Sequence, residues 1–194
     1  LDAARHTVAQ ALETAEQIED DQERTWALDV TAAAQAQAGD PDAARHTFTQ
    51  ALETAAQIED DQQRASALGE IAAAQAQAGD LDAALETAAQ IENDWQRAWA
   101  LREIAKAQSK SGFGHESITT STLIVTDQNE YLPAIAEALA EAGDKENFKR
   151  LLVPCAYYLD AAYKMCGLLA KLYPEQAKVI AAIVIGNASK DTAN

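Results

Sequence analysis

The chain has 194 residues, of which 48% are apolar but only 6% aromatic, and its formal net charge is −16. Binding to nucleic acid or to an anionic membrane requires clustered Lys and Arg, so this charge argues against both partners. Alanine, the best helix former, carries most of the apolar share, and Gly and Pro are few, so we expect an all-α protein.

Residues 1–40 and 41–80 are two copies of one unit, since they differ at only ten of 40 positions. The segment AAAQAQAGD occurs unchanged at 32–40 and at 72–80. Such self-similarity is typical of a repeat array, in which each unit is one supersecondary element that stacks on the next.

Two kinds of turn divide each unit into two helices. In AGDPDAA, Gly39 suits the left-handed residue that ends one helix, and Asp40 caps the next helix. The second turn, IEDDQ or IENDW, has no Gly but offers Asp21, Asp61 or Asp94 as the N-cap. Turns of the first kind recur at spacings of 40, 33, 31 and 31, at Gly39, Gly79, Gly112, Gly143 and Pro174. These spacings predict about five antiparallel helix pairs.

The first helix of each pair has one apolar stripe, at 11, 8, 7 and 4 residues before its turn. Its members are Leu68, Ile71, Ala72 and Gln75, then Leu101, Ile104, Ala105 and Gln108, then Leu132, Ile135, Ala136 and Leu139. This spacing places them on one side of a helix.

The segment ESITTSTLIVT, at 116–126, is rich in β-branched residues and would be a strand by propensity. Its place in the array requires a second helix. We expect a helix, because a lone strand among helices has no pairing partner.

The unit resembles a tetratricopeptide repeat: a large apolar residue, another three later, then a small one, then GDxDxA opening the second helix. In the last unit, YKMCGLL places Gly167 at the small-residue position of the family, seven before Pro174. The first two units depart from the family in their 40-residue period, and Gln stands where tyrosine is usual. The resemblance implies a right-handed α-solenoid and a non-catalytic scaffold that binds a protein or peptide on its concave face. It also implies a fusion to a signalling ATPase or protease, as in bacterial Ala/Gln-rich arrays that resemble this one.

We divide the array into near-identical long repeats, at 1–112, and divergent repeats with C-terminal capping helices, at 113–194. The chain begins within the repeat pattern, so we expect it to be a piece of a larger cytoplasmic bacterial protein, its sensing or assembly arm.

The first helices line the concave side of a solenoid, and their inward positions provide the candidate partner-binding residues. A basic ridge beside an aromatic residue is the most distinctive set in an otherwise acidic chain. The candidates are Trp26, Trp99, Arg102, Lys106, Lys110 and Lys164. Two interpretations stay open: an anchor for a partner's acidic or C-terminal segment, or ordinary charge balance on a solvated surface.

The final helix is apolar around much of its circumference, at Val179, Ile180, Ile183 and Val184. Three interpretations are open: the helix forms a homodimer contact, a further element covers it, or it packs under the neighbouring tyrosines.

No histidine pair, CxxC spacing or glycine-rich phosphate loop occurs, so the sequence predicts no metal and no cofactor. We expect Cys155 and Cys166 to be buried free thiols in a reducing cytosol. Two rivals to the scaffold remain: a small enzyme pocket around Cys155, Tyr158 and Cys166, and a purely structural spacer.

Overall fold

The computed structural model describes residues 2–124, 128–156, 159–175 and 177–178, and every regular element in them is an α-helix, as predicted. The helices are α1 (Asp2–Ala15), α2 (Asp21–Gln37), α3 (Pro41–Ala55), α4 (Asp61–Gln77), α5 (Leu81–Ala89), α6 (Asp94–Lys110), α7 (Gly114–Thr122), α8 (Gln128–Glu141), α9 (Lys145–Ala156) and α10 (Leu159–Leu172). None of them combines the length and the apolar character that crossing a bilayer requires.

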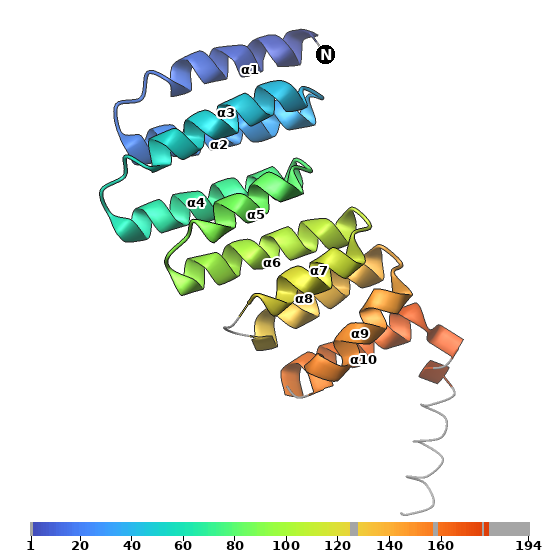
Figure 1. Cartoon of the computed structure of the whole chain (residues 1–194). Coiled ribbons are helices and arrows are strands. Elements are labelled where there is room, and N and C mark those ends of the chain that lie inside the picture. The colour runs from blue at the N-terminus through green and yellow to red at the C-terminus, as the bar shows by residue number, and fades with distance from the viewer. Residues whose placement is uncertain (1, 125–127, 157–158, 176, 179–194) are drawn as a thin grey trace, which may run out of the picture.

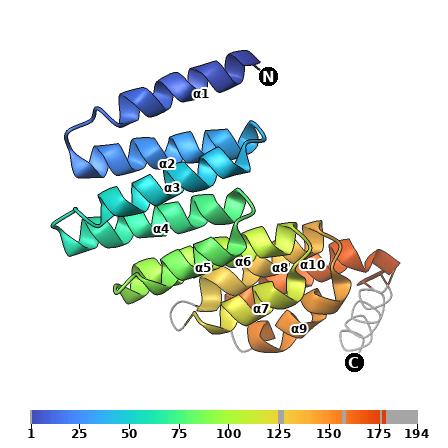
Figure 2. The same cartoon turned by 45° about the horizontal axis from the view of Figure 1, so that its top comes forward.

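The helices form two rows (Figure 1). Helices α2 and α3 are joined by a short turn and pack side by side as a hairpin, and so do α4 and α5, α6 and α7, and α8 and α9. Each even-numbered helix from α2 to α10 also contacts the next even-numbered one. Figure 2 shows the same order of helices, from α1 at one end to α10 near the other. Neighbours in sequence are therefore neighbours in space, as a helical repeat requires.

The glycine turns have the predicted geometry. Gly39, Gly79, Gly112 and Gly143 all have positive φ, between 72° and 90°. At the first turn the Asp40 amide donates to the Gln35 carbonyl and the Gly39 amide to the Ala36 carbonyl, both at 3.0 Å. These two bonds define the Schellman motif, and the other three glycines repeat them.

The N-caps of α2, α4 and α6 lie one residue before the predicted positions, so that prediction was wrong. The carboxylate of Asp20 accepts a hydrogen bond from the Glu23 amide at 2.8 Å, and that of Asp60 accepts one from the Gln63 amide at 2.8 Å. Asn93 caps α6 in the same way. The sequence could not separate the candidates, because both residues of each polar pair can accept this bond.

The second residue of each polar pair is an aspartate, and it forms an ion pair with an arginine instead of capping the helix. That arginine, three residues later, forms an ion pair with the acid and donates to an isoleucine carbonyl in the preceding turn, at 2.7, 2.7 and 3.0 Å. The three sets are Asp21, Arg24 and Ile18; Asp61, Arg64 and Ile58; Asp94, Arg97 and Ile91. The arginine thus ties the end of one hairpin to the start of the next.

The predicted apolar stripe is the buried side of the even-numbered row. In α6, Leu101, Ile104 and Ala105 are 6%, 0% and 0% exposed. The equivalent residues of α4 and α8 are also buried, apart from Leu68, which is partly buried. Many core residues are alanines with little area to bury, so the helices must approach one another closely.

A buried polar pair recurs inside this core. The residue four before the turn glycine is Gln and the residue eight after it is Thr in three hairpins: Gln35 and Thr47, Gln75 and Thr87, Gln108 and Thr120. The Thr87 hydroxyl donates to Gln75 Oε1 at 2.8 Å. In the fourth hairpin the same two positions are buried Leu139 and Leu151. In the other two Gln/Thr pairs, Gln35 Oε1, Thr47 Oγ1 and Gln108 Oε1 have no hydrogen-bond partner among the described residues. These positions therefore accept a polar or an apolar pair, and the polar pair is hydrogen-bonded at Gln75 and Thr87.

The β-branched segment is helical as far as Thr122, where α7 (Gly114–Thr122) ends; Leu123 and Ile124 follow outside the helix, and 125–126 lie outside the described residues. Buried Ser117 explains part of this choice, because its hydroxyl donates to the Ala105 carbonyl of α6 at 2.8 Å. Contacts with the neighbouring helix outweigh the intrinsic preference for a strand.

Candidate interaction surface

The even-numbered row carries three hollows, each between helices that are neighbours in that row. One lies between α2 and α4, one between α4, α6 and α8, and one between α8 and α10. Their lining residues include Trp26, Lys106, Lys110 and Lys164, which were predicted to face the concave side. Four of the six predicted partner-binding residues therefore line a hollow of this row.

The hollow between α4, α6 and α8 has a volume of about 520 Å³ and mixes both charges. Lys106 and Lys110 of α6 face Glu137 and Glu141 of α8 across it, and Glu103 also lines it. The third hollow, of about 420 Å³, contains Lys164 and shares Ala134 and Glu137 with the second. The two hollows therefore adjoin on α8, and together we call them the α4–α10 groove.

The basic ridge of α6 is partly neutralised from within. Glu103 accepts from Arg102 Nε at 3.2 Å and from Lys106 Nζ at 2.9 Å. Lys110 is exposed and has no ion-pair partner among the residues that the structure describes. Lys110, together with exposed Lys164, is therefore the cation of this set most available to a partner.

Trp99 and Trp26 occupy equivalent positions, 13 residues before Gly112 and Gly39, but have different surroundings. Trp99 is partly buried, and a Cβ added at Gly69 of α4 would lie 3.4 Å from its ring. Trp99 thus fills the space between α4 and α6. The Trp26 side chain is 62% exposed and lines the hollow between α2 and α4.

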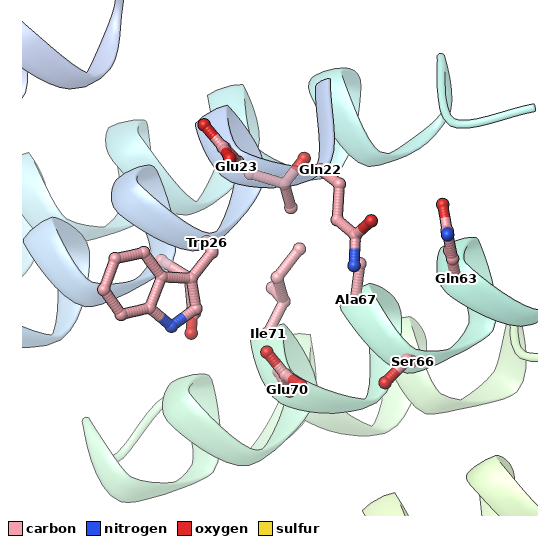
Figure 3. A pocket seen from close by; sticks show the side chains of 10 residues that line it. Gln22, Glu23, Trp26, Gln63, Ser66, Ala67, Glu70 and Ile71 are labelled. Atoms are coloured by element: carbon pink, nitrogen blue, oxygen red, sulfur yellow. The ribbon is translucent and has the colours of Figure 1, made fainter. Parts of the chain in front are cut away.

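That hollow, of about 390 Å³, exists because the equivalent filling residue is missing (Figure 3). Ser66 of α4 stands 13 residues before Gly79, where α6 has Trp99, and it lines the open space. Figure 3 shows Trp26 and Gln22 on α2, with Glu70 and Ser66 on the facing helix α4. The sequence showed the Trp-to-Ser difference, but not that it opens a pocket.

Asp29 is the most unusual group of this pocket. It is only 9% exposed, and its Oδ1 has no hydrogen-bond partner among the described residues. Burial, and then the charge of Glu70, raises the pKa of Asp29 to about 7. Burial also raises the pKa of Glu70. Nothing in the sequence alone distinguishes Asp29 from the other acidic residues of the repeats.

Three other groups of predicted residues have different outcomes. Cys155 is buried, and burial raises the pKa of its thiol to about 11, whereas Cys166 is exposed, so its predicted burial was wrong. Neither cysteine lines the three hollows above. Tyr158 and the predicted dimer or cap residues Val179, Ile180, Ile183 and Val184 lie outside the described residues.

The described residues contain no group of three His, Cys, Asp or Glu side chains able to hold a metal ion. No family model and no curated protein matches the chain. One solved structure that it resembles is the crystal structure of Ton1535 from Thermococcus onnurineus NA1, with 19% sequence identity and a TM-score of 0.43. The match covers 91% of this chain and 53% of that one, so this chain spans about half the length of Ton1535. A similarity at this level carries no argument about function.

Proposed function

We propose that the chain is a non-catalytic scaffold that binds a protein or peptide partner along its even-numbered helices. The observation that carries this proposal is the row of three hollows, which lie where neighbouring even-numbered helices meet. Grooves between successive repeats are the surfaces that helical arrays use for extended ligands.

The finer architecture of the proposal is a right-handed solenoid of about five helix pairs, resembling a tetratricopeptide array, with the even-numbered helices on its concave side. The pattern of helix contacts supports this orientation. Consecutive even-numbered helices contact each other throughout, whereas among the described residues the odd-numbered helices do so only weakly, between α7 and α9, and not between α1 and α3, α3 and α5, or α5 and α7. Helices lie closer together on the inner side of a bent stack than on its outer side.

The groove from α4 to α10 fits a partner segment that carries acidic groups. Lys110 and Lys164 are both exposed, and each lines one of the two hollows of this groove. A partner carboxylate at either lysine gains a charge-assisted hydrogen bond. The Glu137 side chain between them disfavours a uniformly acidic ligand, so we expect acidic residues spaced along the partner rather than a continuous acidic run.

In its cellular setting, the scaffold serves as the sensing or assembly arm of a larger cytoplasmic bacterial protein. The support for this part is the sequence resemblance alone. Homodimerisation through the final helix remains part of the same proposal.

A random peptide library displayed on phage and selected on the whole chain tests the proposal. We expect selected peptides to lose at least tenfold in affinity for a Lys106→Glu, Lys110→Glu double variant, because charges of the wrong sign then face the partner. The matched control is Lys149→Glu with Arg150→Glu, which reverses two exposed charges on α9 in the outer row.

Circular dichroism must show that both variants remain helical. Peptides that bind the groove variant and the α9 variant equally would contradict the proposed surface. Failure to enrich any binding peptide would favour a structural spacer over a scaffold for partners.

A further inference from the structure

The pocket between α2 and α4 contains an acidic side chain in a place where the fold does not require one. Asp29 lies ten residues before Gly39, and the equivalent residue before Gly79 is Gly69. The second copy of the repeat therefore forms the same helix with no side chain at this position. The buried carboxylate of Asp29 is a feature of this pocket rather than of the repeat.

A buried carboxylate oxygen without a partner destabilises a protein unless a ligand compensates it. Asp29 is 9% exposed, its Oδ1 has no hydrogen-bond partner in the described part of the chain, and it lines the pocket. Glu70 lines the pocket from the facing helix, close enough for its charge to act on Asp29. Two carboxylates with an unused acceptor define a site for a positive charge.

The remaining walls indicate which kind of cation fits. Trp26 presents an exposed indole at the pocket (Figure 3), and an aromatic ring attracts ammonium and guanidinium groups through its π face. Ser66 and the amides of Gln22 and Gln63 provide further polar groups. A volume of about 390 Å³ exceeds the needs of one bare metal ion and accommodates the end of a long side chain.

We propose that this pocket binds the ammonium or guanidinium group of a lysine or arginine side chain of the protein partner. Asp29 and Glu70 pair with the charge, and Trp26 covers the methylene stem or the cationic head. The proposal rests on the proposed function, because the partner of the even-numbered row carries the side chain. The partner then combines a basic anchor at α2 and α4 with acidic residues over α6 to α10.

Among the hairpins that begin with α2, α4 and α6, we expect such a pocket only between α2 and α4, because the equivalent space between α4 and α6 is occupied. There Trp99 packs against Gly69, so the space is filled and the acid is absent. Replacing Ser66 by Trp should fill the α2–α4 pocket in the same way. Ser66→Trp is therefore a blocking variant whose design is taken from the chain itself.

The test uses the whole chain and small probes that need no known partner. The carboxyl carbon of Asp29 is followed by NMR during pH titration, with increasing methylguanidinium or methylammonium at constant ionic strength. A bound cation favours the charged carboxylate, so the Asp29 titration midpoint should fall in a saturable way. On the side of α4, Glu70 is the charged group that acts on Asp29, and Glu23 of α2 also lines the pocket, so the titrations of both must be followed too.

Variants assign the effect to the pocket. Trp26→Ala and Glu70→Gln should each raise the probe concentration at half-saturation about tenfold. Ser66→Trp should abolish the shift. The matched control is Trp95→Ala, which removes another exposed indole, 60% exposed on α6 and not part of this pocket, and should change nothing. Glu70→Gln keeps the test decisive should Ser66→Trp fail to fold.

Three outcomes would overturn the proposal. In the first, the Asp29 titration midpoint does not move with either organic cation. In the second, sodium chloride moves the midpoint equally. In the third, Mg²⁺ or Ca²⁺ moves the midpoint at lower concentration than the organic cations, which would make the pocket a metal site.

The peptides selected on the whole chain separate this inference from the proposed function. Replacement of one lysine or arginine by norleucine should weaken binding to the wild-type chain about tenfold, but weaken binding to the Asp29→Asn, Glu70→Gln double variant much less. If peptides bind the α4–α10 groove without any such residue, the proposed function stands and this inference fails. If methylguanidinium binds but no peptide does, a partner side chain as the ligand is ruled out.

Discussion

The carboxylate of Asp29 is buried, which disfavours its charged form. Its backbone is held in place by Leu28 and Ala32, which are buried beside it on α2. Its folded-state pKa of about 7 lies above the ordinary value of 3.8. Between these two values the folded chain holds a proton that the unfolded chain has released. Asp29 therefore makes the protein less stable as the pH rises from about 4 to about 7.

Asp29→Asn should remove this loss, because asparagine stays neutral at every pH. Relative to the wild type, we expect the variant to gain on the order of 3 to 4 kcal/mol in free energy of unfolding between pH 4 and pH 8. Urea denaturation of both chains at several pH values measures the difference. Asp82→Asn, at an exposed position, is the control. A constant difference between the two chains over this range would show that Asp29 does not titrate near neutrality.

The Gln75–Thr87 pair gives a second prediction at the residue scale. Gln75→Leu alone leaves the Thr87 hydroxyl buried without its acceptor and should destabilise the chain by about 1–3 kcal/mol. Adding Thr87→Val should recover most of this loss, because the fourth hairpin packs Leu139 and Leu151 at the same positions. Thermal unfolding of both single variants and the double variant completes the cycle. Additive effects of the two changes would contradict a coupled pair.

At the scale of the element, the turns were the most predictable part of the fold. A glycine at C′ readily adopts the left-handed backbone that ends a helix, so the sequence located the ends of α2, α4, α6 and α8. The helix starts were less certain, because either residue of each neighbouring polar pair can act as the cap. The arginine that holds the second acid, as in Arg64 with Asp61, depends on a contact with the preceding turn that spacing alone does not reveal.

Glycine turns and helix glycines should respond oppositely to the same substitution. Gly79 has a φ of 90°, so Gly79→Ala forces a strained left-handed backbone and should lower the free energy of unfolding by about 1 kcal/mol. Gly167 lies inside α10 with open space around its Cα, so Gly167→Ala should raise it by about 0.5–1 kcal/mol. Denaturant titration of both variants measures the two shifts. Shifts of the same sign would mean that the turn backbone is not what limits Gly79.

The candidate site was less predictable than the helices, because it depends on which side chains of neighbouring helices meet. Sequence phase placed Trp99, Arg102 and Lys106 on the inward side of α6. It did not reveal that Trp99 rests on Gly69 or that Glu103 holds both basic side chains. The role of Asp29 was missed for the same reason, since its meaning comes from Ser66 and Glu70 on the next helix.

For the whole molecule, the net charge of −16 lowers stability, whereas the stacking of the hairpins raises it. Each hairpin is stabilised by its neighbours, as the contacts along α2, α4, α6, α8 and α10 show. The excess of negative charge repels across the same stack. The core clusters overlap on α4, which contributes residues to both, so the packing is continuous between the two ends of the described chain.

Added salt should therefore stabilise the chain. Screening of the excess negative charge reduces repulsion in the compact state, so the midpoint of thermal unfolding should rise as sodium chloride increases from 10 to 150 mM, a range over which the Debye length falls from about 30 to about 8 Å. Differential scanning calorimetry measures this change, with a neutral osmolyte at matched osmolality as the control. A midpoint that falls with added salt would indicate that the ion pairs contribute more than the repulsion.

The central claim is that partners bind along the even-numbered helices, and amide chemical-shift mapping of the full chain with a selected peptide tests it most directly. We predict that the shifted resonances belong to α2, α4, α6, α8 and α10, including Trp26, Lys110 and Lys164, and that α3, α5, α7 and α9 remain unchanged. Shifts concentrated on the odd-numbered helices, or spread evenly over both rows, would contradict the claim.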